Sequence, residues 1–248
     1  MHPARIASLL APFLAPESLT DQQLAQVSTY LDLLLKWNAR INLTSVRQPE
    51  EIVTRHFGES FFTARTLCHP EPRLIGAKDL AFDFGCHPER GRSAGDGRVE
   101  GLLPPPTGLH LIDVGSGAGF PGLPIKLYAP ALSVTLIESN QKKATFLREV
   151  IRVLTFTNID VFAGRAEACP RTAAIVTLRA VEKPERALPA AARLVSPGGR
   201  LALLLGASRA GDVQALLPGF TWAPPVALPD SSSRIVAIGT LSRQESRK

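Results

Sequence analysis

The sequence predicts an α/β fold, a mostly parallel sheet preceded by a helical segment. Three observations carry this prediction: strand and helix patterns alternate after residue 108, a glycine-rich turn follows the first of those strands, and helical patterns precede them. Such alternation requires a parallel sheet covered by helices on both faces. The 248 residues, 45% of them hydrophobic, suffice for one such domain with a sizeable core and a helical extension.

Residues 1–75 are predicted to form an N-terminal helical cap. Thr20 and Gln23 have the spacing of a capping box, which starts a helix over residues 19–38 with leucines recurring on one face. A second helix begins near Pro49, because proline suits the first helical position. Both helices carry an apolar stripe and are expected to pack against the rest of the chain.

Residues 76–108 interrupt this pattern. They are rich in glycine, contain three consecutive prolines and have few large apolar residues, so we predict a mobile insertion. Just before and within it, Cys68-His69-Pro70-Glu71 recurs as Cys86-His87-Pro88-Glu89. Adjacent Cys-His pairs lack the loop spacing of zinc ligands, so no metal site is predicted. Three cysteines in all favour reduced thiols over a disulfide framework.

The second folded unit is expected over residues 109–241, followed by a basic tail at 242–248. Two further strands close it, at residues 219–228 and 234–241, and the link between them is too short for a parallel crossover, so they should be antiparallel. A Ser-Pro-Gly-Gly turn should precede the last parallel strand. The parallel strands are predicted at residues 110–114, 133–137, 159–162, 174–178 and 200–205, and helices from about 121, over 140–154 and over 184–195.

The glycine-rich turn at residues 115–122 predicts a nucleotide cofactor. Without a Cβ the chain can turn sharply and approach a ligand closely. Gly117, Gly119 and Gly122 have the spacing of the dinucleotide fingerprint, with Glu138 placed to bind a ribose. Asp113 in front of the glycines gives the alternative D-x-G-x-G-x-G order, which resembles motif I of the class I S-adenosylmethionine-dependent methyltransferases.

Charge and hydropathy limit the partners. The net charge of +6 and the sequence pI of about 9.6 favour nucleic acid, although a merely basic surface would give the same balance. No apolar run approaches the ~20 residues of a membrane span, and no signal pattern opens the chain. We expect a cytoplasmic monomer with no membrane partner.

Several motifs outside the turn narrow the resemblance. These motifs are Asn42-Leu43-Thr44-Ser45, Arg55-His56 with Glu59-Ser60, Lys143 with Phe146-Leu147, and Arg179-Ala180. Together with the Phe-Pro-Gly that ends the turn, they are similar to the small-subunit ribosomal RNA guanine-N7 methyltransferase G family, also called glucose-inhibited division protein B. The similarity covers nearly the whole chain outside the insertion.

The resemblance implies a Rossmann-like class I methyltransferase sheet and transfer of a methyl group from S-adenosyl-L-methionine to N7 of one guanosine in 16S rRNA, on naked RNA or on the small ribosomal subunit. It implies active-site or RNA-facing roles for Arg55, His56 and Arg179. Guanine N7 carries a lone pair and no proton, so the reaction needs placement and no general base. The implied cofactor-binding residues are Asp113, Gly115, Gly117, Gly119, Phe120, Glu138, Ala166, Glu167 and Arg179.

Some alternatives remain open. By its spacing alone, His56 reads as a packed core histidine, and only the motif makes it a site residue. The family usually has Leu-Lys-Gly where this chain has Leu204-Leu205-Gly206, and Arg209 is a candidate to replace the missing lysine. A small-molecule methyltransferase and a catalytically weak rRNA-binding assembly factor are the alternative functions. RNA-dependent methyl transfer distinguishes all three.

Overall fold

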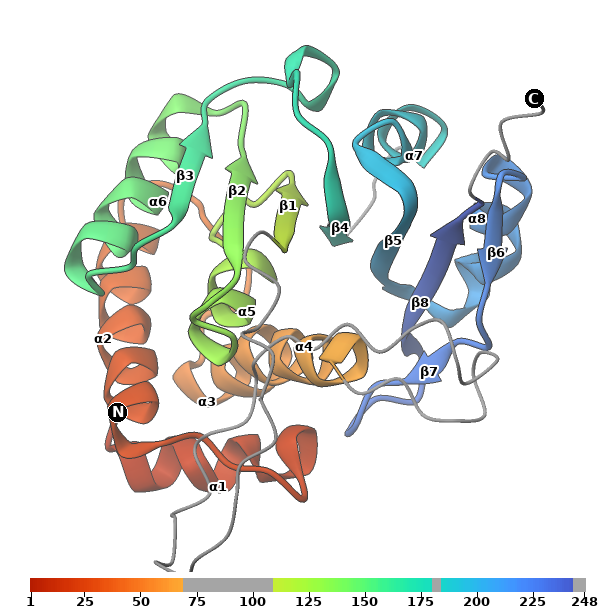
Figure 1. The fold of residues 1–248 in the computed structure, drawn as a ribbon. Coiled ribbons are helices and arrows are strands. Elements are labelled where there is room, and N and C mark those ends of the chain that lie inside the picture. Colours follow the sequence, from red (N-terminus) through yellow and green to blue (C-terminus); the bar gives the residue numbers. More distant parts are fainter. Residues whose placement is uncertain (69–108, 180–183, 243–248) are drawn as a thin grey trace, which may run out of the picture.

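The computed structural model describes residues 1–68, 109–179 and 184–242. Within these residues, eight strands form one sheet in the order β3-β2-β1-β4-β5-β8-β6, with β7 paired to β8 (Figure 1). The predicted insertion at 76–108 and nearly all of the basic tail lie outside the described residues.

The sheet is parallel through its first five strands and antiparallel at its end. β1 pairs with β2 and β4, β2 with β3, and β4 with β5, all in parallel. β8 runs antiparallel to β5, β6 and β7, so the predicted fold class is confirmed. The strands are β1 His110–Val114, β2 Ser133–Ile137, β3 Ile159–Phe162, β4 Ala173–Arg179, β5 Val195–Gly206, β6 Phe220–Trp222, β7 Val226–Ala227 and β8 Arg234–Leu241.

Helices cover both faces of this sheet. One face packs through Leu111 and Leu136 in a hydrophobic cluster that includes side chains of α1, α2, α4, α5 and α6. The other packs through Ile112 and Leu203 with α7 and α8. The helices are α1 Pro3–Leu14, α2 Asp21–Asn38, α3 Pro49–Ile52, α4 Glu59–Cys68, α5 Gly122–Tyr128, α6 Gln141–Val153, α7 Pro184–Ala192 and α8 Ala210–Leu216, with a π-helical turn η1 at Val53–Gly58 and 3₁₀ turns η2 at Ala166–Ala168 and η3 at Ala207–Arg209.

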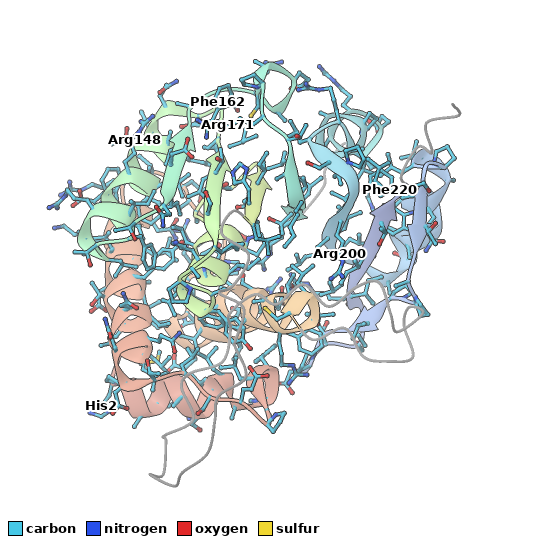
Figure 2. All side chains as sticks on the ribbon, in the orientation of Figure 1. His2, Arg148, Phe162, Arg171, Arg200 and Phe220 are labelled. Carbon is cyan, nitrogen blue, oxygen red and sulfur yellow. The ribbon has the colours of Figure 1, made fainter. Side chains whose placement is uncertain are left out.

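The N-terminal helices belong to the same core as the sheet. Thr20 caps α2 in the predicted capping box, and the predicted stripe of α2 is buried in the cluster that holds Leu111. Figure 2 shows side chains filling the space between these helices and the strands, with Arg200 of β5 close to α4. The Arg200 Nη1 donates to the carbonyl of Leu67 at 3.3 Å. This bond joins β5 to α4, two elements that are distant in sequence.

Several elements differ from the predictions. The predicted Ser-Pro-Gly-Gly turn is a bulge inside β5, because Val195 pairs with Ala173 and the next paired residue is Arg200. The helix predicted over 184–195 consequently ends earlier, at Ala192. The strand predicted over 219–228 is divided into β6 and β7. Helices α1 and α8 are not predicted at all; α1 contains Pro12, which disfavours a helix interior.

Candidate functional site

A cavity of about 500 Å³ opens at the carboxyl ends of β1, β2 and β4. The ends of parallel strands are where open α/β sheets bind their ligands. Of the predicted site residues, Gly115, Ala166, Glu167 and Arg179 line this cavity. Apolar side chains such as Leu178 share its wall with these polar groups, a mixture suited to a small organic cofactor.

Gly115 lines the cavity and leaves open space beside its backbone. Its φ is +67°, a conformation that favours glycine, and no atom lies within 4 Å of the position that a Cβ would take. A side chain there would project into the space in front of the loop. A backbone that leaves such room at a strand end, beside a cavity of this size, is what the predicted S-adenosylmethionine requires.

Asp113 supports the loop from inside. Its side chain is fully buried, and its Oδ1 and Oδ2 accept hydrogen bonds from the Thr177 hydroxyl at 2.8 Å and from the Gly122 N–H at 3.3 Å. Burial raises the pKa of this carboxyl to about 6, against the lowering effect of these bonds. Asp113 is not among the residues that line the cavity, and its predicted cofactor contact stays a prediction.

Glu138 joins the loop to the next helix. Its carboxylate oxygens accept from the Gly117 N–H and the Asn140 N–H, both at 2.8 Å. Its chain neighbours Ile137 and Ser139 line the cavity, which puts the carboxylate at the cavity's edge. The ribose contact of Glu138 stays a prediction, and the bond to Gly117 gives it a second role in holding the turn.

Tyr30 of α2 packs against the back of the turn. Its hydroxyl donates to the Ala118 carbonyl at 2.5 Å, and its ring stacks on Phe120 with centroids 5.5 Å apart. At Gly119, with φ +93°, a Cβ would overlap the Tyr30 hydroxyl and the Leu123 side chain. Gly119 and Phe120 thus build the turn and do not line the cavity. Sequence reasoning missed Tyr30, whose signal is a polar tip on an apolar helix face.

Arg179 stands at the end of β4, where β4 meets the N-terminal helices. Its Nη2 donates to Glu59 Oε2 at 3.0 Å and to the Arg55 carbonyl at 2.7 Å. Its Nη1 is buried and has no hydrogen-bond partner among the described residues. Burial lowers the pKa of Arg179 to about 10, so the guanidinium stays charged at neutral pH and keeps the N–H donors of Nη1 for a ligand.

Glu59 holds a second arginine as well. The Arg234 guanidinium bonds to Glu59 Oε1, so one buried carboxylate lies between two cations. Arg234 opens β8 and pairs in register with Gly206 at the end of β5. Because β8 is antiparallel, its first residue lies at the same sheet edge as the last residues of the parallel strands. The predicted antiparallel strand at 234–241 already indicated that its first residue lies at this edge. Arg234 is nevertheless not among the predicted site residues.

His56 lies between the turn and the cap. Its Nε2 is 2.7 Å from the Thr44 hydroxyl, and its ring centroid is 4.9 Å from that of Phe120. Burial, then the charges of Arg179, Arg55 and Arg234, lower the pKa of His56 to about 3. His56 is therefore neutral at physiological pH. His56 is packed against the core residue Phe120, as its spacing predicts, and it also lies near Arg179, as the motif implies.

The exposed Arg55 side chain, the third residue implied in the active site, pairs with Glu51 at 2.7 Å. Its backbone carbonyl, and not its guanidinium, contacts Arg179. Both Arg55 and His56 lie in the π-helical turn η1, a distortion that often marks functional positions in helices.

The chain is similar to known proteins over most of its length. A family model described as rRNA small subunit methyltransferase G matches residues 23–76 and 105–218. The chain belongs to this family. A protein of Xanthomonas campestris pv. campestris (strain B100), named Ribosomal RNA small subunit methyltransferase G, is 32% identical over 220 residues, 88% of this chain and 85% of the relative. One of the same name from Chloroflexus aggregans is 34% identical over 203 residues, 79% and 70% of the two chains.

Among solved structures, the magnesium protoporphyrin IX methyltransferase of Synechocystis PCC 6803 with bound SAM is similar, with a TM-score of 0.47 and 18% identity. The alignment covers 54% of this chain and 71% of that one. The family model and the named relatives, and not this structural likeness, confirm the family predicted from the motifs. The segments matched by the family model contain Glu59 and Arg179 but end before Arg234.

Leu205, at the usual position of the family lysine, lies in the apolar cluster on the α7 and α8 face. Arg209 is exposed and ends η3, one short turn beyond β5. Among the described residues, no three histidine, cysteine or acidic side chains gather as metal ligands would, and no helix has the length and apolarity to cross a membrane. Apart from Cys68, the repeated Cys-His motif lies outside the described residues.

Proposed function

We propose that this chain transfers a methyl group from S-adenosylmethionine to N7 of a guanosine in 16S rRNA. The observation that carries the proposal is the family match, because it spans the cavity residues together with the Arg55 to Glu59 turn. The cavity, the open Gly115 and the orphaned Arg179 donor support S-adenosylmethionine as the cofactor. A protein of this type would act as a monomer in the cytoplasm on small-subunit RNA.

Several residues of this chain suit the cofactor. Gly115, Ala166 and Glu167 would contact it along the cavity wall, and Glu138 would accept from its ribose at the edge. The unpartnered Arg179 Nη1 would donate to an acceptor such as a carboxylate. When bound, S-adenosylmethionine supplies an electrophilic methyl group.

The surrounding residues position and desolvate, and none needs to remove a proton. Guanine N7 attacks with its own lone pair, so catalysis rests on alignment. His56 is neutral beside three arginines, and its Nε2 is hydrogen-bonded to the Thr44 hydroxyl. In this proposal it therefore shapes the site and does not act as a base. The buried Glu59 fixes Arg179 at the cavity. A guanidinium that is already fixed does not have to reorganise when the ligand binds.

The test uses labelled S-adenosylmethionine and small ribosomal subunits that lack the modification, with large subunits as the control. We expect label on one guanosine of 16S rRNA, mapped to N7, and none on large subunits. RNA binding without transfer would contradict the proposal in favour of an assembly factor. Transfer only to small molecules would contradict it in favour of the other alternative.

A further inference from the structure

A second cavity, of about 290 Å³, lies beside the site. One side of it is formed by Thr54, Arg55 and Glu59 from η1 and α4, and the other by Ser231 and Arg234 around the start of β8. Of these residues, only Arg55 is among the predicted site residues, and Glu59 belongs to the same sequence motif. Its volume lies just below the ~300 to 1,000 Å³ of drug-sized ligand sites, which suits a single ring system.

The two cavities share a wall. Arg179 lines the larger one, and it is held by the Glu59 carboxylate and the Arg55 carbonyl, whose residues line the smaller one. A group in the smaller cavity would therefore lie across the Arg179–Glu59 pair from the cofactor. A substrate strand that places one base near the cofactor has neighbouring nucleotides within reach of such a position.

The lining chemistry distinguishes between the parts of an RNA strand. Two arginines face two carboxylates, Glu59 and Asp230, so the cavity has no excess of positive charge. The Arg234 guanidinium is already bonded to Glu59, and that of Arg55 to Glu51. A phosphate would have to compete with these carboxylates. A base edge presents both donors and acceptors, and it matches a wall of guanidinium, carboxylate and hydroxyl groups without breaking an ion pair.

We propose that this second cavity receives a nucleobase of the substrate RNA. The inference rests on the proposed function, since it assumes an RNA substrate for the neighbouring site. In this proposal the residues around Arg234 position the substrate. The cofactor binds in the larger cavity, on the other side of the Arg179–Glu59 pair.

The test fills the cavity from its rim. Ser231 lines it, whereas the adjacent Ser232 does not and is exposed, so Ser231→Trp and Ser232→Trp form a matched pair. Thr54→Met narrows the cavity from the opposite side and guards against a folding defect in the loop variant. Each is measured for thermal midpoint, S-adenosylmethionine Kd, RNA Kd at several salt concentrations, and methyl transfer to small subunits.

We expect Ser231→Trp and Thr54→Met to weaken RNA binding at least tenfold and to slow transfer, with cofactor Kd unchanged and Ser232→Trp like wild type. The slope of log K against log salt should stay the same. A slope reduced by about 0.7 would mean a lost phosphate contact and would overturn the base assignment. Filled variants that bind RNA like Ser232→Trp would overturn it too. If wild type transfers no label, the proposed function fails instead.

Discussion

The glycine turn at residues 115–122 differs from the neighbouring cluster of Arg179, Arg234, Glu59 and His56, which we call the arginine wall, in how completely its polar groups are hydrogen-bonded. In the turn, Asp113, Glu138 and Tyr30 all have hydrogen-bond partners within the protein. In the wall, Arg179 Nη1 and His56 Nδ1 are buried without one among the described residues. Because buried polar groups are normally satisfied, the unpartnered atoms of the wall are candidates for ligand contacts, whereas the groups of the turn are bonded within the protein.

The largest effect is expected where the wall is held together. Glu59→Gln leaves Arg179 and Arg234 without the buried carboxylate between them, which should cost about 4 kcal/mol of unfolding free energy and most of the methyl transfer. Urea unfolding followed by circular dichroism measures the loss. Glu51→Gln is the control, because its pair with Arg55 is exposed and is worth less than about 1 kcal/mol. Equal losses in the two variants would mean that the buried cluster is not what stabilises the wall.

The buried carboxyl of Asp113, which supports the turn, should make the stability of the protein depend on pH. Folding raises the pKa of Asp113 from 3.8 to about 6, so the folded protein binds this proton more tightly than the unfolded chain. The contribution of Asp113 to stability is therefore full below pH 3.8, and it falls by about 3 kcal/mol as the pH rises to about 6, at about 1.4 kcal/mol per pKa unit.

Asp113→Asn removes this dependence without changing the shape of the side chain. The unfolding free energy of the variant minus that of wild type should rise with pH between about 4 and 6, measured by urea unfolding at each pH. Parallel curves for the two proteins would show that the Asp113 carboxyl titrates normally.

A smaller effect tests whether the helical cap reaches the cofactor. Tyr30→Phe keeps the stacking on Phe120 but leaves the Ala118 carbonyl without its donor, which should cost about 1 to 2 kcal/mol. Part of that loss should appear as a severalfold weaker S-adenosylmethionine Kd in calorimetry. Tyr128→Phe, the chain's other tyrosine, loses a bond to Glu17 instead and should leave Kd unchanged. An unchanged S-adenosylmethionine Kd in Tyr30→Phe would show that this contact of the helical cap with the turn does not affect cofactor binding.

The smallest expected effect concerns His56. Because its pKa is about 3, it carries no charge at any pH where the enzyme is assayed. The ratio of the single-turnover rates of wild type and His56→Asn should therefore be constant between pH 6 and 8. A ratio that changes with an apparent pKa near 6.5 would make His56 a titrating group and would contradict its role as a neutral wall.

The sequence was sufficient for the parallel core of the fold. The bounds predicted for β1, β2 and β3 are those observed, because short apolar runs between turn residues leave little freedom. The bulge in β5 could not be predicted, since a Ser-Pro-Gly-Gly segment reads as a turn whether the strand begins before or after it. Helix α1 was hidden by its prolines. The division into a cap at 1–75 and a domain at 109–241 stays a prediction.

For the site, the sequence identified the residues of the motif, but it did not show which of them face the cavity and which face the protein interior. Gly115, Ala166, Glu167 and Arg179 line the cavity, as a cofactor contact requires. Gly119 and Phe120 belong to the same motif but face Tyr30, which lies far away in the sequence and sets the direction of the turn. Such long-range packing leaves no trace in the motif itself.

The reversal of β8 changes where functional residues should be sought in this family. In a sheet of parallel strands, ligand contacts are sought at positions where strands end. Here one strand runs the other way and its opening residue, Arg234, meets them, 175 positions after the glutamate it contacts. Comparisons of family members that stop before the final strand would overlook it, and alignment of the residue that opens this strand offers a direct way to sort relatives by whether a second arginine holds the buried glutamate.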